Sequence, residues 1–108
     1  MSAPLGEFEQ LVLLALVRLE GDAYGAAIQR EIEERTGRAV SLGAVYTTLL
    51  RVEQKGYVDA SLGEPTPQRG GRRKKIYRLL PAGQRELAGS LAALRRMTRG
   101  LTPRLELP

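Results

Sequence analysis

The chain has 108 residues, 43% of them apolar, which is enough for one folded domain with a modest core and argues against disorder. It has no cysteine and no histidine, which excludes disulfides, thiolate chemistry, a histidine general base and most zinc sites. The net charge is +5, but residues 1–40 carry four basic and seven acidic side chains, whereas residues 41–108 carry thirteen and five. The excess of positive charge in residues 41–108 favours a polyanionic partner for this part of the chain. The alternative is that these charges only keep the surface soluble.

The longest apolar stretch, Leu11 to Val17, is far too short to cross a membrane, and the N-terminus lacks the features of a signal peptide. We therefore expect a soluble cytoplasmic protein that does not contact a membrane. No cluster of metal ligands and no general base is visible, so we expect no metal, no cofactor and no enzymatic activity.

The first predicted helix spans roughly Leu5–Glu20 and is apolar around most of its girth, so it must be covered on more than one side, by its own domain or also by a partner subunit. A second helix is predicted from Asp22, a good N-cap residue, to just before Gly37, a left-handed stop. Gly25 leaves room near the start of this helix for another helix or for a phosphate, and close packing is the favoured reason.

A third helix is predicted from Ser41 to Gly56, after a short turn that contains glycine. Its inner stripe is apolar and consists of Leu42, Val45, Leu49 and Val52. The opposite face is small or hydroxylic with one arginine, and consists of Gly43, Ala44, Thr47, Thr48 and Arg51. Small residues let a helix lie deep in a groove, and two helices joined in this way match a helix-turn-helix.

A β-hairpin follows, with strands near residues 57–62 and 76–79 and a loop at 63–71. The loop and the second strand carry six cations in ten positions: Arg69, Arg72, Arg73, Lys74, Lys75 and Arg78. Protection of a strand edge needs one or two charges, so we favour a counter-charge that the fold itself does not supply, namely nucleic acid.

The last predicted helix begins at Pro81 and ends near Arg99. A short heptad-like seam alternates spacings of four and three along Leu87, Leu91, Leu94, Thr98 and Leu101. The seam could pack on its own domain, but a complete winged unit leaves little core to cover, so we favour pairing between subunits. The predicted fold is mainly α with a small β-hairpin: a winged helix-turn-helix DNA-binding domain at 1–80, a dimerisation helix at 81–101 and a flexible tail at 102–108.

Residues 41–58, SLGAVYTTLLRVEQKGYV, resemble the third helix of PadR-type transcriptional regulators. The GRRKKIYRL run at 71–79, the Pro-Ala-Gly at 81–83 and the Tyr-Gly pair at 24–25 are similar to the same family. The resemblance covers nearly the whole chain, from Leu5 to about Leu101. It implies homodimers held by the C-terminal helix, usually with help from the first helix, that repress transcription at pseudo-palindromic operators. It also implies a response to small phenolic or drug-like ligands bound near the dimer interface.

Two positions depart from the family pattern. Thr47 stands where the family often has proline, so it keeps its N–H and offers a hydroxyl. Leu80 stands where the family often has a threonine that caps the last helix, and losing such a cap costs about 1 kcal/mol. The short C-terminal region resembles the smaller subclass of the family, which has a single dimerisation helix.

The predicted mechanism places the third helix in the major groove and the basic wing on phosphates or in the minor groove of double-stranded operator DNA. We expect the wing to supply most of the affinity for DNA and the third helix to set the register of the protein on the DNA. Whether Tyr46 and Arg51 contact a base or a phosphate stays open. The predicted DNA-binding residues are Tyr24, Ser41, Gly43, Ala44, Tyr46, Thr47, Thr48, Arg51, Arg69, Arg72, Arg73, Lys74 and Lys75.

The predicted dimer contacts are Leu5, Phe8, Val12, Leu87, Leu91, Leu94, Thr98 and Leu101. A small hydrophobic or aromatic effector would bind at that interface, with Phe8 and Leu91 in its lining. Two alternatives stay open: a winged helix that docks its basic wing on an acidic protein, and one that binds RNA.

Overall fold

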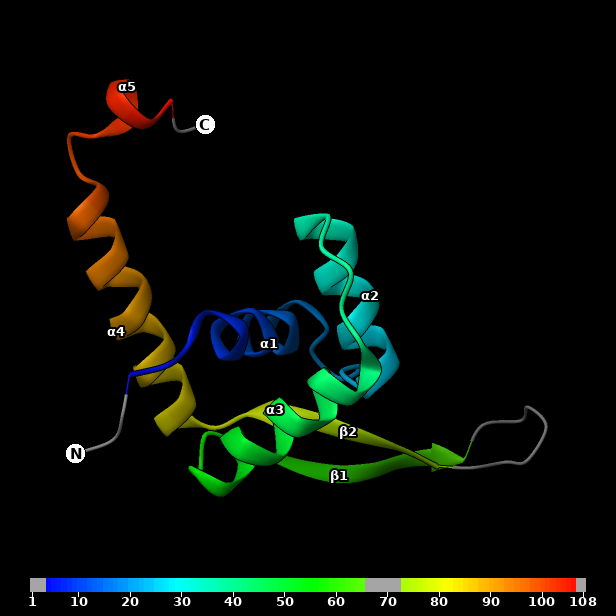
Figure 1. Cartoon of the computed structure of the whole chain (residues 1–108). Helices are drawn as coiled ribbons and strands as arrows, with labels where there is room; N and C mark the ends of the chain where they lie inside the picture. The colour runs from blue at the N-terminus through cyan, green and yellow to red at the C-terminus, as the bar shows by residue number, and fades with distance from the viewer. Residues whose placement is uncertain (1–3, 66–72, 107–108) are drawn as a thin grey trace.

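The computed structural model describes residues 4–65 and 73–106. The elements in chain order are α1 (Glu7–Arg18), α2 (Gly25–Thr36), α3 (Leu42–Gln54), β1 (Val58–Pro65), β2 (Arg73–Leu79), α4 (Pro81–Thr98) and α5 (Thr102–Leu105) (Figure 1). The strands form one antiparallel hairpin, the wing. The prediction of a mainly helical chain with a small hairpin is thereby confirmed.

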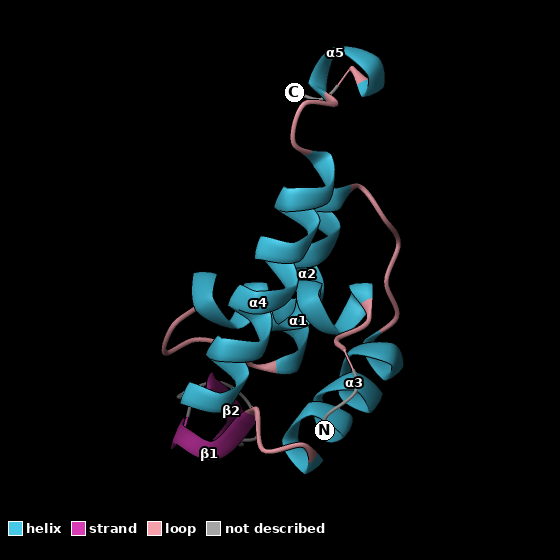
Figure 2. Ribbon diagram, turned by 90° about the vertical axis from the view of Figure 1, so that its left-hand side faces the viewer, coloured by secondary structure: helices cyan, strands magenta, loops and turns pink. Residues whose placement is uncertain are grey.

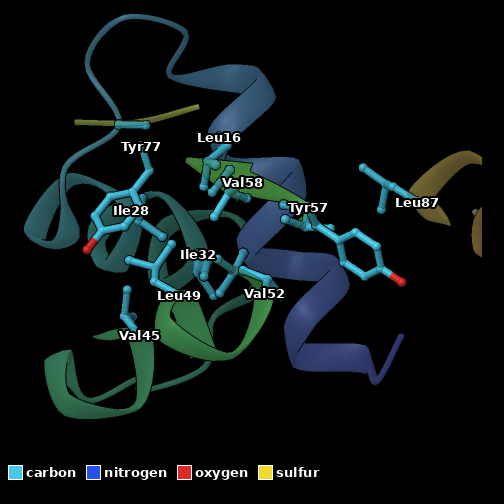
Figure 3. Close-up of a cluster of buried hydrophobic side chains, with 14 of the residues drawn as sticks. Leu16, Ile28, Ile32, Val45, Leu49, Val52, Tyr57, Val58, Tyr77 and Leu87 are labelled. Carbon is cyan, nitrogen blue, oxygen red and sulfur yellow. The ribbon is translucent and has the colours of Figure 1, made fainter. Parts of the chain in front are cut away.

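Helix α1 lies at the centre of the fold and contacts α2, α3, β2 and α4 (Figure 1). Val12 and Leu13 on this helix are completely buried, which explains why its apolar residues extend around so much of its girth. Side chains from every neighbouring element meet there to form a single core, in which Figure 3 labels Leu16, Ile28, Ile32, Val45, Leu49, Val52, Tyr57, Val58, Tyr77 and Leu87.

The ends of α2 and the start of α3 follow local rules with one exception. Gly37 adopts a left-handed φ of 73° after α2, and the Ser41 hydroxyl accepts a hydrogen bond of 3.0 Å from the Ala44 N–H at the start of α3. Both predicted boundaries are therefore confirmed. The predicted N-cap at Asp22 is wrong, because Asp22 lies in the preceding turn and Tyr24 occupies the N-cap position without a side-chain cap.

The wing is joined to the helical body at its base. Strand β2 pairs with β1 from Val58 opposite Leu79 outward, and an irregularity follows Leu62. The Tyr77 N–H donates to the Ala23 carbonyl at 2.9 Å, which fixes β2 against the turn before α2. The base of the wing is thus positioned by backbone bonds as well as by the core.

Helix α4 begins without a side-chain cap at Leu80, as predicted. Instead the Leu80 N–H donates to the Tyr57 carbonyl at 2.8 Å, and Gly83 approaches the same carbonyl so closely that a Cβ would lie 2.3 Å from its oxygen. Leu87 is buried in the core, but the later part of α4 and α5 extend away from the body (Figure 2). The radius of gyration is accordingly 15.6 Å, against about 13 Å for a compact chain of this length.

The segment predicted as a flexible tail includes the four-residue helix α5, which has Pro103 in its first turn. The sequence prediction missed this helix because two prolines in seven residues suggested an irregular end. Along the described part of the chain, every helix is too short or too polar to cross a bilayer.

Candidate nucleic-acid interface

The outer face of α3 is exposed and nearly free of bulky groups. Gly43, Ala44, Thr47 and Arg51 are all exposed, and a Cβ added to Gly43 would meet no atom within 4 Å. Ser41 is also exposed, although its oxygen already accepts the helix-capping bond from Ala44. Helix α3 and the wing lie at the end of the molecule opposite α5 in both views (Figures 1 and 2). This end therefore presents an unobstructed helix beside a β-hairpin.

Thr48 does not belong to this face. Its exposed fraction is 5%, because it follows Val45 by three residues and precedes Val52 by four, which places all three side chains on the inner stripe. The prediction that Thr48 faces DNA is wrong. Leu42, predicted for the inner stripe, lies at its margin and is 37% exposed.

Leu50 is a member of the outer face that the sequence analysis missed. Its side chain is 56% exposed, and it follows Thr47 by three residues and Gly43 by seven. Those spacings are the helical signal that could have identified it. An exposed aliphatic side chain of this kind, like the methyl group of Thr47, can contact the methyl group of thymine.

Tyr46 connects the outer face to α2. Its side chain is 46% exposed, and its phenol lies against Gly25, where a Cβ would come within 2.5 Å of both the ring and the hydroxyl oxygen. Gly25 thus lets Tyr46 pack closely against α2, which is the role that the sequence analysis favoured for this glycine. Tyr46 is therefore packed against α2 and still partly exposed to solvent.

The wing contributes exposed cations to the same end of the molecule. Lys74 and Lys75 are exposed. Arg69 and Arg72 lie outside the described residues, and Arg73 is described in its backbone alone. The sixth predicted cation, Arg78, differs from the others.

Arg78 forms a two-pronged ion pair with Asp59 on the opposite strand, at 2.6 and 2.9 Å. The guanidinium holds the pKa of Asp59 below its ordinary value. One of the six cations in the run is therefore neutralised within the fold, contrary to the expectation that the fold supplies no counter-charge.

Tyr24 gathers two cations from different elements. The Arg30 guanidinium donates to the Tyr24 hydroxyl at 3.0 Å, and the Lys74 ammonium lies 4.0 Å from the centre of its ring. The hydrogen bond from Arg30, together with the charge of Lys74, lowers the pKa of the Tyr24 phenol. We call these three residues the Tyr24 cluster. Arg30 was missed from sequence because it stands in an acidic helix and is joined to Lys74 through the tertiary structure alone.

The predicted dimer contacts divide into two groups. Leu5, Val12 and Leu87 are 6%, 0% and 5% exposed within the single chain, so they are core residues and the prediction that they form an intersubunit surface is wrong. Phe8, Leu91, Thr98 and Leu101 are partly buried, and Leu94 is 54% exposed. Met97, 75% exposed on the same helix, was missed because it lies beside the heptad-like seam.

Two hollows adjoin the predicted effector residues. Leu91 lines an open hollow of about 510 Å³ between α1, β2 and α4, together with Leu14, Leu16, Val17, Tyr77, Leu79 and Leu87. Phe8 lines a different hollow, beside the start of α3. Within one chain the two predicted lining residues therefore do not share a cavity.

Solved structures with the same fold come from several organisms. A PadR-like transcriptional regulator from Bacillus cereus has a TM-score of 0.74 at 19% identity, covering 94% of this chain and 93% of that one. A PadR family regulator from Clostridium difficile has a TM-score of 0.70 at 24% identity, covering 93% and 99%. One from Eggerthella lenta has a TM-score of 0.66 at 25% identity, covering 94% and 88%. No curated protein matches the sequence.

The sequence itself matches a family model over residues 13–89, which is well over half of the chain. That model describes the transcriptional regulator PadR-like family, a family of regulators and not of enzymes. The matched segment includes the described residues of the outer face of α3 and of the wing. The chain therefore belongs to the PadR-like family of winged-helix, DNA-binding transcriptional regulators.

Proposed function

We propose that this protein is a homodimeric repressor that places α3 in the major groove of operator DNA and its wing on phosphates or in the minor groove. The observation that carries the proposal is the uncluttered outer face of α3 at the same end of the molecule as exposed Lys74 and Lys75. The sequence predicts a cytoplasmic location, and binding to the genome agrees with that prediction.

The residues of α3 suit a helix that approaches base edges closely. Gly43 and Ala44 add almost no bulk, so the helix backbone can come near the floor of the groove. Thr47 offers a hydroxyl and a methyl group to bases, and Arg51 can donate to a guanine edge or to a phosphate. The N-terminal end of α3 also favours a nearby phosphate, because unpaired N–H groups and the helix dipole make it positive.

Dimerisation through α4 is supported by what the single chain leaves uncovered. The later part of this helix extends beyond the body, with Leu94 and Met97 exposed at 54% and 75% (Figure 2). Pairing two such helices buries apolar surface that otherwise faces water. A dimer that binds successive major grooves holds its recognition helices about 34 Å apart.

A small hydrophobic or aromatic effector is supported by the hollow of about 510 Å³ beside α4, whose lining is mostly apolar. A ligand there would contact α1, β2 and α4 together, and could alter how the wing and the dimer helix are placed. A thermal-shift screen of small aromatic compounds tests this part. Hits that Leu91→Ala abolishes support an effector in this hollow, and a screen without hits contradicts it.

The decisive experiment is selection of bound genomic fragments followed by footprinting and salt titration. If the dimer neutralises roughly 6–10 phosphates, its affinity falls by about 10³–10⁵ between 50 and 200 mM salt. The footprint should cover two half-sites about one helical turn apart. Absence of a mobility shift at low salt would instead favour an acidic protein partner, and preferential competition by structured RNA would favour RNA.

A further inference from the structure

The Tyr24 cluster brings two cations to one aromatic ring. Lys74 lies on β2 and Arg30 on α2, and Tyr24 stands at the N-cap of α2. The ammonium is 4.0 Å and the guanidinium carbon 6.0 Å from the same ring centre. The sum of these two distances is therefore the upper limit of the separation between the two charges. Wing and helix therefore meet at the Tyr24 side chain, and each contributes one cation to it.

These two cations have no acidic partner among the side chains that the structure describes, a set that does not include the side chain of Glu64. Arg35, Arg38, Lys55 and Arg78 each form an ion pair with a carboxylate within 2.5–2.9 Å. Arg30 and Lys74 instead share a neutral phenol. Holding two like charges close together is unfavourable without a counter-charge, and an anion that contacts both removes the repulsion.

We propose that Tyr24, Arg30 and Lys74 form one phosphate-binding site, in which both cations hold the same DNA backbone phosphate and Tyr24 positions them. This inference rests on the proposed function and adds a defined site to it, with Arg30 as a new DNA-binding residue. A phosphate held in this way fixes the angle between α2 and the wing on DNA.

The chemistry of the three groups fits a phosphate. The guanidinium presents several donors, of which one is used on the Tyr24 hydroxyl, and the ammonium over the ring has three N–H donors, which a phosphate can accept from. Because the Tyr24 hydroxyl accepts from Arg30, its own proton is available to a third oxygen. Three donors from two elements can then surround one phosphate.

The test is a double-mutant cycle on the full-length protein with a random-sequence 30-bp duplex as the probe. Arg30→Gln and Lys74→Gln should each lower the slope of log K against log salt by about 0.9 for every phosphate that the variant no longer neutralises. If the cations share one phosphate, the combined variant loses less affinity than the product of the two single losses, because the first change already releases the phosphate. Losses that simply multiply, or no loss at all, would overturn the shared site.

Two further variants keep the result interpretable. Arg35→Gln, which removes one charge from the other end of the same helix, should bind nearly as the parent does; an equal loss would show a general charge effect and overturn the site.

Tyr24→Phe keeps the ring under Lys74 but removes the hydroxyl. Arg30→Gln should therefore cost less binding affinity in this background than in the parent, and an unchanged cost would contradict the positioning role of Tyr24. Parent protein that fails to bind the duplex at low salt would contradict the proposed function itself, whereas steep salt dependence with unaffected variants contradicts the site alone.

Discussion

Gly83 decides how closely α4 can approach the body of the protein. A Cβ there would lie 2.3 Å from the Tyr57 carbonyl oxygen and 2.9 Å from the Tyr57 Cβ, and the carbonyl is held in place because it also accepts the Leu80 N–H. A backbone atom cannot move aside as a side-chain end can. The first turn of α4 therefore requires glycine for its packing rather than for its dihedral angles.

We predict that Gly83→Ala lowers the free energy of unfolding by about 1–3 kcal/mol, the usual cost of overpacking. The matched control is Gly89→Ala in the same helix, where a Cβ would meet nothing within 4 Å. That change should raise stability by about 0.5–1 kcal/mol, since alanine is the better helix former. Urea unfolding at one protein concentration measures both, and equal effects would contradict the role of the close approach.

Glu9 joins the beginning of α1 to the end of α3. Its carboxylate accepts from the Gly6 N–H at 2.9 Å and from the Lys55 ammonium at 2.9 Å, while its exposed fraction is 7%. Burial raises the pKa of this carboxyl, but the bonds from Gly6 and Lys55 outweigh burial, so the pKa is lower than usual. The negative form of Glu9 is therefore the form that the fold stabilises.

We predict that Glu9→Gln lowers the free energy of unfolding by about 1–3 kcal/mol at neutral pH, because it removes charge-assisted hydrogen bonds. A lowered folded-state pKa contributes stability above the unfolded-state value, and this contribution is lost as the pH falls through the folded value. The difference between variant and parent should thus shrink in acid below about pH 4. The exposed Glu7, paired with Arg38, provides the control: Glu7→Gln should cost much less. A difference that persists in strong acid would contradict the assignment.

At the scale of elements, the proposed function gives α3 and the wing different tasks on DNA. We predict that Thr47→Ala lowers the preference for operator over scrambled duplex by about 1 kcal/mol, the net worth of one hydrogen bond, while binding to scrambled DNA stays close to that of the parent. Titrations on both duplexes measure the ratio. Equal losses on the two DNAs would remove Thr47 from base recognition.

The wing cations should act on all sequences alike. We predict that Arg72→Ala combined with Arg73→Ala weakens binding to operator and scrambled duplexes equally, with the salt slope falling by about 0.9 for each phosphate that the wing then leaves unneutralised. Arg95→Ala combined with Arg96→Ala removes the same charge from exposed positions of α4 and should leave the slope nearly unchanged. Loss of sequence preference in the wing variant would show that the wing contacts base edges.

At the scale of the whole molecule, the later part of α4 presents apolar side chains to solvent, with Leu94 and Met97 exposed at 54% and 75%. We predict that Leu94→Asp converts the proposed dimer to a monomer in sedimentation experiments, because it places a charge on an apolar seam whose leucine is 54% exposed in the single chain. Operator affinity should fall in parallel, since one recognition helix then binds alone. Ala93→Asp adds the same charge one residue away, off the seam, and should remain dimeric. Two variants that behave alike would contradict this seam.

Periodicity and turn chemistry were enough to predict α1 to α4 and the hairpin, because those signals are local. Gly37 ends α2 in a left-handed conformation, and the Ser41 hydroxyl caps the start of α3. Periodicity did not assign every face correctly: Thr48 was predicted to face DNA, whereas packing against the core places it inside. Leu5, Val12 and Leu87 looked free for a partner because apolar spacing alone does not distinguish a core from an interface.

The amino-acid sequence by itself determined a basic wing, a helix with a small outer face and a C-terminal helix with an apolar seam, since each depends on residues close together in the chain. The tertiary structure decided which charges remain unpaired. It neutralises Arg78 with Asp59 across the hairpin. It also brings Arg30 and Lys74, which are 44 residues apart in sequence, to the Tyr24 side chain. The physical reason is that ion pairs form through space, so a count of cations along the chain cannot show which of them a fold leaves for DNA.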